Sequence, residues 1–313
     1  MRIIERRRIE ELLADIDLLP LISRAFRDYS AGRAIVPPVA ELLLEAGEVH
    51  IKYGAIAGDE RCVIKVASGF YGNAARGLPS SHGLMLVFRA DTGEPEAILL
   101  DEGHLTDVRT AVAGAVAAGA LARPDSERIG VLGTGTQARL QVRHLAPVVE
   151  TRSLVAWGRD PVRVERYRTD MTAAGFSVEV ARTPGEVAAA CDLIVTTTPS
   201  TEPLLAAADI RPGTHISAIG SDTAAKQELA TDVLARADVV VADSLEQCRT
   251  RGEIARAMAA GAITEERVVE LGALLAGEAT GRTSADQISL FDSTGVAVQD
   301  IAIATAIVQA AAG

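Results

Sequence analysis

A glycine-rich turn between a short apolar strand and a helix constrains this chain more than any other feature. Residues 129–138 read Ile-Gly-Val-Leu-Gly-Thr-Gly-Thr-Gln-Ala, which contains the pattern Gly-x-Gly-x-x-Ala. In this pattern Gly133 permits the tight turn, Gly135 leaves room for a pyrophosphate, and Ala138 lets the helix pack closely on the strand. The phosphates then lie at the helix N-terminus. The motif predicts a dinucleotide-binding domain, and the alternative is an ordinary glycine-rich turn.

Alternating strands and helices surround this turn. The alternation begins after Arg123-Pro124-Asp125 and is typical of an α/β fold with a doubly wound parallel sheet, the Rossmann type. We expect helices between the first four strands and a turn-containing connection before the fifth. The expected strands are 128–132, 153–157, 193–196, 215–219 and 238–242, followed by a further strand at 287–292.

The first 120 residues predict a different, α+β domain. Turn residues separate its short strands, which favours an antiparallel or mixed sheet. Near the other end of the sequence, 297–312 is rich in Ala, Ile and Val, so we expect a buried helix that returns to the first domain or to a subunit interface. The domains are therefore expected to be 1–120 completed by 296–313, and 121–295. Within 1–120 we expect helices at 6–13, 18–31 and 106–121, and strands at 49–54, 61–67, 83–89 and 96–101.

Composition excludes several classes of function. The net charge is −11, so the chain lacks the excess of Lys and Arg that a nucleic-acid partner requires. Three widely spaced cysteines indicate neither a disulfide framework nor a zinc site, which fits a cytoplasmic protein. The five histidines show no ligand spacing, so no metal is expected. No apolar run approaches the ~20 residues that span a bilayer.

The choice between NAD and NADP stays open. The second expected strand is followed by Arg159 and Asp160. An acidic side chain there would bind the ribose hydroxyls of NAD, whereas an arginine would bind the 2′-phosphate of NADP or stack on adenine. The order of the two residues slightly favours NADP.

Five motifs occur in order along the chain: Ile64-Lys65, Gly77-Leu78-Pro79-Ser80, Thr92-Gly93-Glu94-Pro95, Leu105-Thr106-Asp107-Val108-Arg109-Thr110-Ala111 and Gly220-Ser221-Asp222. Together they resemble the ornithine cyclodeaminase/mu-crystallin family. The resemblance runs from about residue 33 to residue 300. It implies a homodimer in which the first domain, with the C-terminal helix, binds a small amino or imino acid and forms the subunit contact, while the central domain binds NAD(H) or NADP(H).

The resemblance also implies roles for individual residues. Lys65 corresponds to a lysine that binds the substrate carboxylate, Arg109 to an arginine beside nicotinamide and substrate, and Asp222 to the catalytic proton carrier. The residues that it places along the dinucleotide are Ser80, Arg109, Thr110, Thr136, Gln137, Thr198, Ile219, Gly220, Ser221, Asp222, Lys226 and Ser293. The glycine turn and the end of the second strand add Gly133, Gly135, Ala138 and Arg159 to the expected cofactor-binding residues.

The same three side chains suit imine reduction on chemical grounds. The reaction needs a hydride donor, a cationic clamp for the α-carboxylate and an acid that keeps the nitrogen protonated. Each residue also has a plainer interpretation. Lys65 could extend from an apolar strand to solvent, Arg109 could form an ion pair with Asp107 or Glu102, and Asp222 could cap a turn.

One departure from the family pattern concerns the clamp. Where cyclodeaminases of this family carry an additional arginine, the sequence reads Pro37-Pro38-Val39-Ala40. His50 and Lys52 lie two residues apart on one expected strand, hence on one face, and we expect them near Lys65. Extra positive charge there suits a substrate with a second carboxylate; a half-exposed strand with ordinary polar residues is the alternative.

Four functions follow from these observations. The first is that of an NAD(P)H-dependent imine reductase or amino-acid dehydrogenase acting on a small α-imino or α-amino acid, with reduction of iminosuccinate to aspartate as the leading candidate. The second is a role of the ectoine-utilisation type, which residues 50–73 resemble. The third is ornithine cyclodeamination, an ammonia-lyase reaction without net redox change. The fourth is a non-catalytic binding protein like mu-crystallin, against which the joint presence of Lys65, Arg109 and Asp222 speaks.

Overall fold

The contacts within the protein divide it into two units. The computed structural model describes residues 1–313 apart from the side chains of Tyr71 and Ala74. Unit 1 comprises 1–109 and 296–313, and unit 2 comprises 110–295. The first division falls inside helix α3 (His104–Leu121), before the expected boundary at residue 120. The second part of α3 belongs with α4 (Thr136–Leu145), since Gln141 Nε2 donates to the Thr110 carbonyl at 3.1 Å.

A mixed sheet forms the centre of unit 1. Its strand order is β1-β7-β6-β5-β4-β2, with β3 paired to β4. β1 runs parallel to β7 and the other pairs are antiparallel, which confirms the mixed sheet predicted from the turns. The strands are β1 (Arg2–Glu5), β2 (Ala34–Ile35), β3 (Ala40–Leu44), β4 (Gly47–Ile56), β5 (Arg61–Gly69), β6 (Ser81–Arg89) and β7 (Pro95–Leu100).

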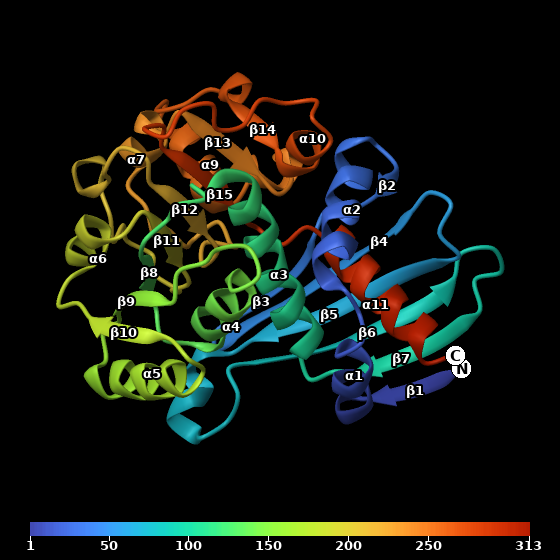
Figure 1. The fold of residues 1–313 in the computed structure, drawn as a ribbon. Helices are drawn as coiled ribbons and strands as arrows, with labels where there is room; N and C mark the ends of the chain where they lie inside the picture. The colour runs from blue at the N-terminus through green and yellow to red at the C-terminus, as the bar shows by residue number, and fades with distance from the viewer. The chain divides into compact units, whose positions relative to one another are not determined.

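Helices cover one face of this sheet. Helix α11 (Val298–Ala310) packs along α2 (Leu18–Ser30) and over β4 and β5, and α1 (Arg6–Leu13) lies beside it (Figure 1). Ile301, Ile303 and Ile307 of α11 are fully buried there. Helix α11 therefore packs within unit 1.

The two faces of the sheet differ in burial. Side chains alternate between the faces along each strand, and the register aligns them in rows across the strands. The covered face buries apolar residues together with two lysines. The opposite face is apolar but partly exposed, with Ile3 62 % and Tyr53 36 % accessible. Adjacent rows are Ile4–Leu99–Met85–Lys65–Lys52 on the covered face and Ile3–Ile98–Leu86–Ile64–Tyr53 on the open face.

Unit 2 is a doubly wound parallel sheet of the Rossmann type, as predicted. Its order is β10-β9-β8-β11-β12-β15-β13-β14. Strands β9 and β10 therefore follow β8 on one side of the sheet, and β11 and β12 follow on the other, so the strand order reverses between β8 and β11. Ligands of such sheets bind at the carboxyl ends of the strands, at this reversal. The strands are β8 (Ile129–Leu132), β9 (Ser153–Trp157), β10 (Ser177–Val180), β11 (Leu193–Thr196), β12 (His215–Ala218), β13 (Val239–Ala242), β14 (Val268–Glu270) and β15 (Ser289–Asp292).

One predicted helix of unit 2 is wrong. The connection from β11 to β12 holds only the single turn η2 (Ala207–Asp209) instead of a helix. Pro199, Pro203 and Pro212 interrupt this stretch, and proline removes a helical hydrogen bond and clashes with the preceding turn. The other helices are α5 (Pro161–Ala173), α6 (Pro184–Ala190), α7 (Thr231–Arg236), α8 (Leu245–Cys248), α9 (Gly252–Ala259) and α10 (Leu271–Leu275). Within the described residues, no helix is both long and apolar enough to cross a membrane.

Candidate active site

The glycine turn starts at the carboxyl end of β8. Gly133 has a φ of +119°, in the left-handed region that side chains disfavour. A Cβ at this position would lie 2.5 Å from Thr197 Oγ1. Its N–H donates to the Trp157 carbonyl at 2.9 Å. The turn itself therefore requires glycine, as the motif predicts.

The second glycine stands in open space. Gly135 is the N-cap of α4, and a Cβ there would meet no atom within 4 Å, so packing does not demand glycine. Thr136 is exposed, Gln137 is half-buried and Ala138 is fully buried between helix and sheet. Free space in front of the first N–H groups of a helix fits a pyrophosphate. These residues would hold the phosphates of a dinucleotide.

A hollow of about 720 Å³ follows the carboxyl end of β9. Its lining includes Trp157, Arg159 and Val180. Asp160 Oδ1 accepts the N–H groups of Val162 at 2.9 Å and Arg163 at 3.3 Å, so this carboxylate caps α5. The acidic residue that could bind ribose is thus engaged in the helix cap, while Arg159 is exposed beside the hollow.

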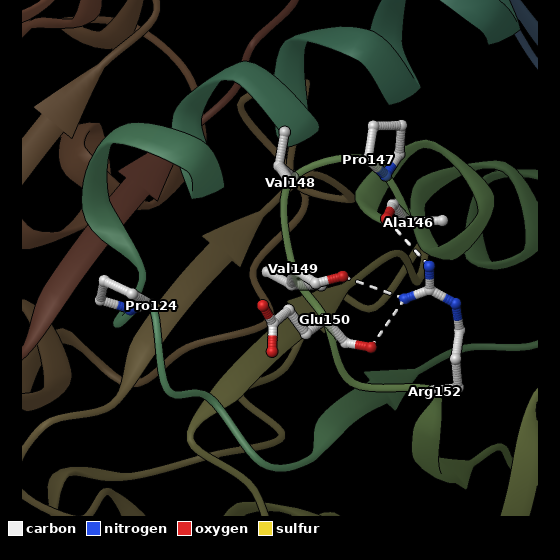
Figure 2. Close-up of a pocket in the computed structure, with 7 residues that line it drawn as sticks. All are labelled: Pro124, Ala146, Pro147, Val148, Val149, Glu150 and Arg152. Carbon is white, nitrogen blue, oxygen red and sulfur yellow. Dashed lines mark hydrogen bonds between the residues drawn. The ribbon is translucent and has the colours of Figure 1, made fainter.

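A second hollow, of about 570 Å³, lies away from this edge (Figure 2). The guanidinium of Arg152 donates to the carbonyls of Ala146 at 3.0 Å, Val149 at 3.0 Å and Glu150 at 3.1 Å. Arg152 thereby satisfies carbonyls that follow the end of α4. Since Arg152 precedes β9, the hollow is at the amino edge of the sheet, and its arginine serves a structural purpose.

Asp222 lies in the turn after β12, following Ile219, which is buried, and Gly220. Its carboxylate accepts a hydrogen bond from Lys226 Nζ at 2.6 Å, and its side chain is 48 % accessible. Ser221 Oγ donates to the Lys226 carbonyl at 2.9 Å, which holds the turn closed. Lys226, expected along the dinucleotide, is therefore the ion-pair partner of Asp222.

Two further expected cofactor residues lie at the same edge of unit 2. Thr198 follows β11, and its backbone N–H donates to Glu228 at 2.5 Å. Ser293 follows β15 and is 3 % accessible, and its hydroxyl has no hydrogen-bond partner among the described residues. A buried hydroxyl without a partner is costly unless a ligand satisfies it. This orphaned group fits a dinucleotide that extends across β11, β12 and β15.

In unit 1, Lys65 and Arg109 share one carboxylate. Lys65 Nζ lies 2.8 Å from Asp300 Oδ2, and Arg109 Nε donates to Asp300 Oδ1 at 2.9 Å. Arg109 also donates to Gln299 Oε1 at 3.2 Å. All three charged side chains are almost completely buried. Arg109 thus pairs with Asp300 of α11, and Glu102, one of the alternative partners, pairs with Arg6.

The electrostatics of this cluster favour an additional anion. Burial, then the nearby Arg109, lowers the pKa of Lys65 to about 7, even though Asp300 acts in the opposite direction. Burial alone would raise the pKa of Asp300, but Arg109 and Lys65 outweigh it and hold the pKa below its usual value. One carboxylate, that of Asp300, thus faces two buried cations. A carboxylate from a substrate would stabilise the charged form of Lys65.

The two additional basic residues have different surroundings. Lys52 pairs with Lys65 across β4 and β5, is 8 % accessible, and contributes to lowering the pKa of Lys65. His50 Nδ1 lies 3.3 Å from Glu41 and its Nε2 lies 3.5 Å from Glu48. Lys52 thus adds positive charge next to Lys65, whereas two carboxylates face His50.

The remaining expected residues are less informative. Ser80 is exposed in the loop before β6, and its carbonyl accepts the Phe70 N–H at 2.7 Å. The Thr110 carbonyl accepts from Gln141, as described for α3. Among the residues that the structure describes, no group of three or more metal-ligating side chains could hold an ion. Reasoning from sequence missed Asp300, whose signal was a lone carboxylate in an apolar helix.

The comparisons with known proteins agree with this architecture. An iminosuccinate reductase of Paracoccus denitrificans is 31 % identical over 99 % of this chain and 97 % of its own length. The structure of Thermococcus litoralis Δ1-pyrroline-2-carboxylate reductase with NADH and L-proline matches with a TM-score of 0.94 and 28 % identity, covering 100 % and 98 % of the two chains.

An archaeal alanine dehydrogenase dimer with bound NAD matches with a TM-score of 0.91 and 34 % identity, covering 99 % of this chain and 95 % of that one. The family model described as the ornithine cyclodeaminase/mu-crystallin family matches residues 2–313. The resemblance seen in the sequence motifs is confirmed over the whole chain: this protein belongs to the ornithine cyclodeaminase/mu-crystallin family.

Proposed function

We propose that this protein is an NAD(P)H-dependent reductase of a small α-imino acid. The balanced reaction converts imine, NAD(P)H and a proton into amine and NAD(P)⁺. The observation that supports it best is the buried cluster of Lys65, Arg109 and Asp300, in which two cations share one carboxylate. An α-carboxylate is the anion that such a substrate brings.

Each step assigns work to the chain's own residues. Lys65 and Arg109 bind the substrate carboxylate, and Asp300 keeps both cations oriented. Asp222, held by Lys226, carries the proton that keeps the imine nitrogen positively charged and its carbon electrophilic. The bound dinucleotide supplies the hydride. Gly135 and the first turn of α4 would hold its phosphates, and Ser293 offers a hydroxyl that lacks a partner among the described residues.

Within this class we propose iminosuccinate, which becomes aspartate. Lys52 adds a second buried ammonium beside Lys65 and contributes to lowering its pKa, so this part of the sheet carries positive charge that suits a substrate with two carboxylates. The iminosuccinate reductase among the relatives supports this choice of substrate. His50 contributes less than its position in the sequence indicates, because Glu41 and Glu48 flank it.

An absorbance assay at the NADH band tests the proposal. Oxaloacetate or pyruvate with ammonium generates the dicarboxylic or the monocarboxylic imine, and we expect faster NADH consumption with oxaloacetate. Ammonia release from ornithine without net NADH change would instead establish cyclodeamination. Turnover only of diaminobutyrate-type compounds would favour the ectoine-utilisation type, and binding without any turnover would favour a non-catalytic protein.

Lys52 allows a sharper form of this experiment. Lys52→Met should lower kcat/KM for the dicarboxylic imine by roughly tenfold or more, the effect of one charged hydrogen bond, and leave the monocarboxylic imine within about twofold. Equal losses for both substrates would show that Lys52 does not bind the second carboxylate. They would also contradict iminosuccinate as the preferred substrate.

Arg159 is expected to decide the preferred dinucleotide. Asp160 is engaged in capping α5, so the arginine is the charged group free to meet a 2′-phosphate. Arg159→Ala should raise Kd for NADPH by roughly tenfold and Kd for NADH by no more than about twofold. Fluorescence titration of the two reduced dinucleotides measures both values. Equal losses would show that Arg159 only stacks on adenine.

We propose that the open face of the unit 1 sheet forms the interface of a homodimer. Its row of Ile98, Leu86, Ile64 and Tyr53 is apolar, and the related archaeal alanine dehydrogenase is a dimer. Ile98, Leu86 and Ile64 are half-buried and Tyr53 is exposed, and a contiguous apolar surface within reach of solvent marks an interface. Ile64→Lys places a charge in the middle of the row and should yield a folded monomer in light scattering after size exclusion. A dimer that persists would place the interface elsewhere.

A further inference from the structure

A buried carboxylate joins the two loops that follow β11 and β12. Glu228 is completely buried, and its Oε2 accepts the Thr196 hydroxyl at 2.7 Å and the Gly220 N–H at 3.0 Å. Its Oε1 accepts the Thr198 N–H at 2.5 Å. One side chain therefore fixes the end of one strand and the start of both loops.

The glycine of the Gly-Ser-Asp motif is explained by the same contact. A Cβ on Gly220 would lie 2.5 Å from Glu228 Oε2 and would also collide with the Thr198 carbonyl. Glycine at 220 thus permits the carboxylate to approach the backbone that leads to Asp222. The glycine of the motif and the buried Glu228 are therefore parts of the same structural contact.

Glu228 is itself firmly held. Its backbone N–H donates to Glu253 Oε1 of α9 at 2.6 Å, and its carbonyl accepts the Leu204 N–H at 2.7 Å. Burial raises the pKa of Glu228 to about 7, against the opposing effect of the hydrogen bonds from Thr196 and Thr198. Three donors converge on this completely buried carboxyl. If the side chain served packing alone, an apolar residue would fill the space without bringing a buried acceptor that has to be satisfied.

The position of these loops indicates what they serve. The glycine turn follows β8, and the hollow beside Arg159 follows β9, on one side of the reversal in strand order. A dinucleotide at such a reversal extends to both sides, so its other half lies over the ends of β11 and β12. The loops that Glu228 holds are on that side.

We propose that Glu228 is a positioning residue that fixes Thr198 and the turn from Gly220 to Asp222 for the nicotinamide half of the cofactor and for the proton carrier. The proposal rests on the proposed function for its kinetic consequence. Its consequence for dinucleotide binding does not depend on which substrate is reduced.

Glu228→Gln tests the proposal because the amide keeps the shape and puts an NH₂ group where an acceptor is needed. NADH affinity is measured by fluorescence titration and ADP-ribose affinity by competition. We expect Kd for NADH to rise about tenfold and that for ADP-ribose to stay within about twofold, since only NADH has the nicotinamide half. The kcat for imine reduction should fall by roughly 30-fold or more, with a smaller change in substrate KM.

Asp192→Asn is the matched control. Asp192 accepts the N–H groups of Glu127 at 3.1 Å and Arg128 at 3.2 Å, so it joins strand ends at the amino edge of the same sheet. We expect it to lower the melting temperature while both affinities and kcat stay within about twofold of wild type. Equal changes in NADH and ADP-ribose affinity for Glu228→Gln, or none, would overturn the proposal.

A second variant tests the proposal if the first variant does not fold. If Glu228→Gln does not fold, Thr196→Val removes one donor in the same shape, and Kd for NADH should rise about threefold while that for ADP-ribose is unchanged. Identical ratios would again overturn the proposal. Should the wild type reduce no imine, the reaction proposal fails, whereas the ratio of the two affinities still decides the role of Glu228.

Discussion

Asp222→Asn should lower kcat by roughly 10²–10⁴ while leaving substrate KM and NADH affinity within several-fold, the effect of losing a positioned acid or base. The amide oxygen can still accept the hydrogen bond from Lys226, which is 2.6 Å from the carboxylate in the wild type. The shape of the turn is kept and the transferable proton is lost. Steady-state kinetics over a range of pH should show that one limb of the wild-type profile disappears.

Asp209 supplies the control for this experiment. Its carboxylate accepts the Ala206 N–H at 2.9 Å, so it caps a turn in the same unit and takes no part in the proposed chemistry. Asp209→Asn should keep kcat and the pH profile of the wild type. If Asp222→Asn behaved in the same way, Asp222 would be a turn-capping residue and the mechanism would lack its acid.

Lys65→Met should lower kcat/KM by roughly 10²-fold, mainly through KM, because one charged hydrogen bond to the substrate carboxylate is lost. Methionine fills a similar space in the buried row, and Arg109 remains paired with Asp300. NADH affinity should not change.

The pH dependence of KM is an independent test of the role of Lys65. With the pKa of Lys65 near 7, the ammonium that binds a carboxylate is present below pH 7 and is lost above it. In the wild type, KM should rise towards tenfold per pH unit above 7, and in Lys65→Met this rise should be absent. An unchanged slope in the variant would assign the titration to another group.

Arg61→Met is the matched control on the same strand. Arg61 is also buried, and its guanidinium pairs with Glu96 at 2.8 Å and 2.9 Å. Its loss should lower the melting temperature, because Glu96 then lacks its main partner. Substrate KM and its pH dependence should stay as in the wild type. A rise in KM equal to that of Lys65→Met would mean that buried charge in β5 matters only for stability.

Sequence patterns predicted the buried elements well and the exposed or shortest ones poorly. β5, β9, β11 and the helix α11 follow clear apolar periods, and the structure confirms them within a few residues. β10 (Ser177–Val180) is a short, mostly exposed edge strand, so it lacks the buried alternation that marks a strand. β14 has only three residues.

The candidate site shows the same division between local and distant information. The glycine turn is local, so its residues could be assigned from spacing alone. Lys65 and Arg109 were recognisable as cations in unusual surroundings, but the partner of Arg109 lies 191 residues away in the sequence. The periodicity of apolar residues does not predict contacts between residues so far apart in the sequence. Only the three-dimensional fold, which brings α11 over β5, reveals that Asp300 joins them.

Helix α11 also imposes an order on synthesis and folding. Unit 1 is built from two segments that flank unit 2 in the sequence, and α11 belongs to the second segment. While the ribosome is still translating unit 2, Lys65 and Arg109 exist without the carboxylate that compensates them. Uncompensated cations resist burial. The covered face of the sheet therefore closes only after α11 has been made, whereas every residue of unit 2 has by then already been translated.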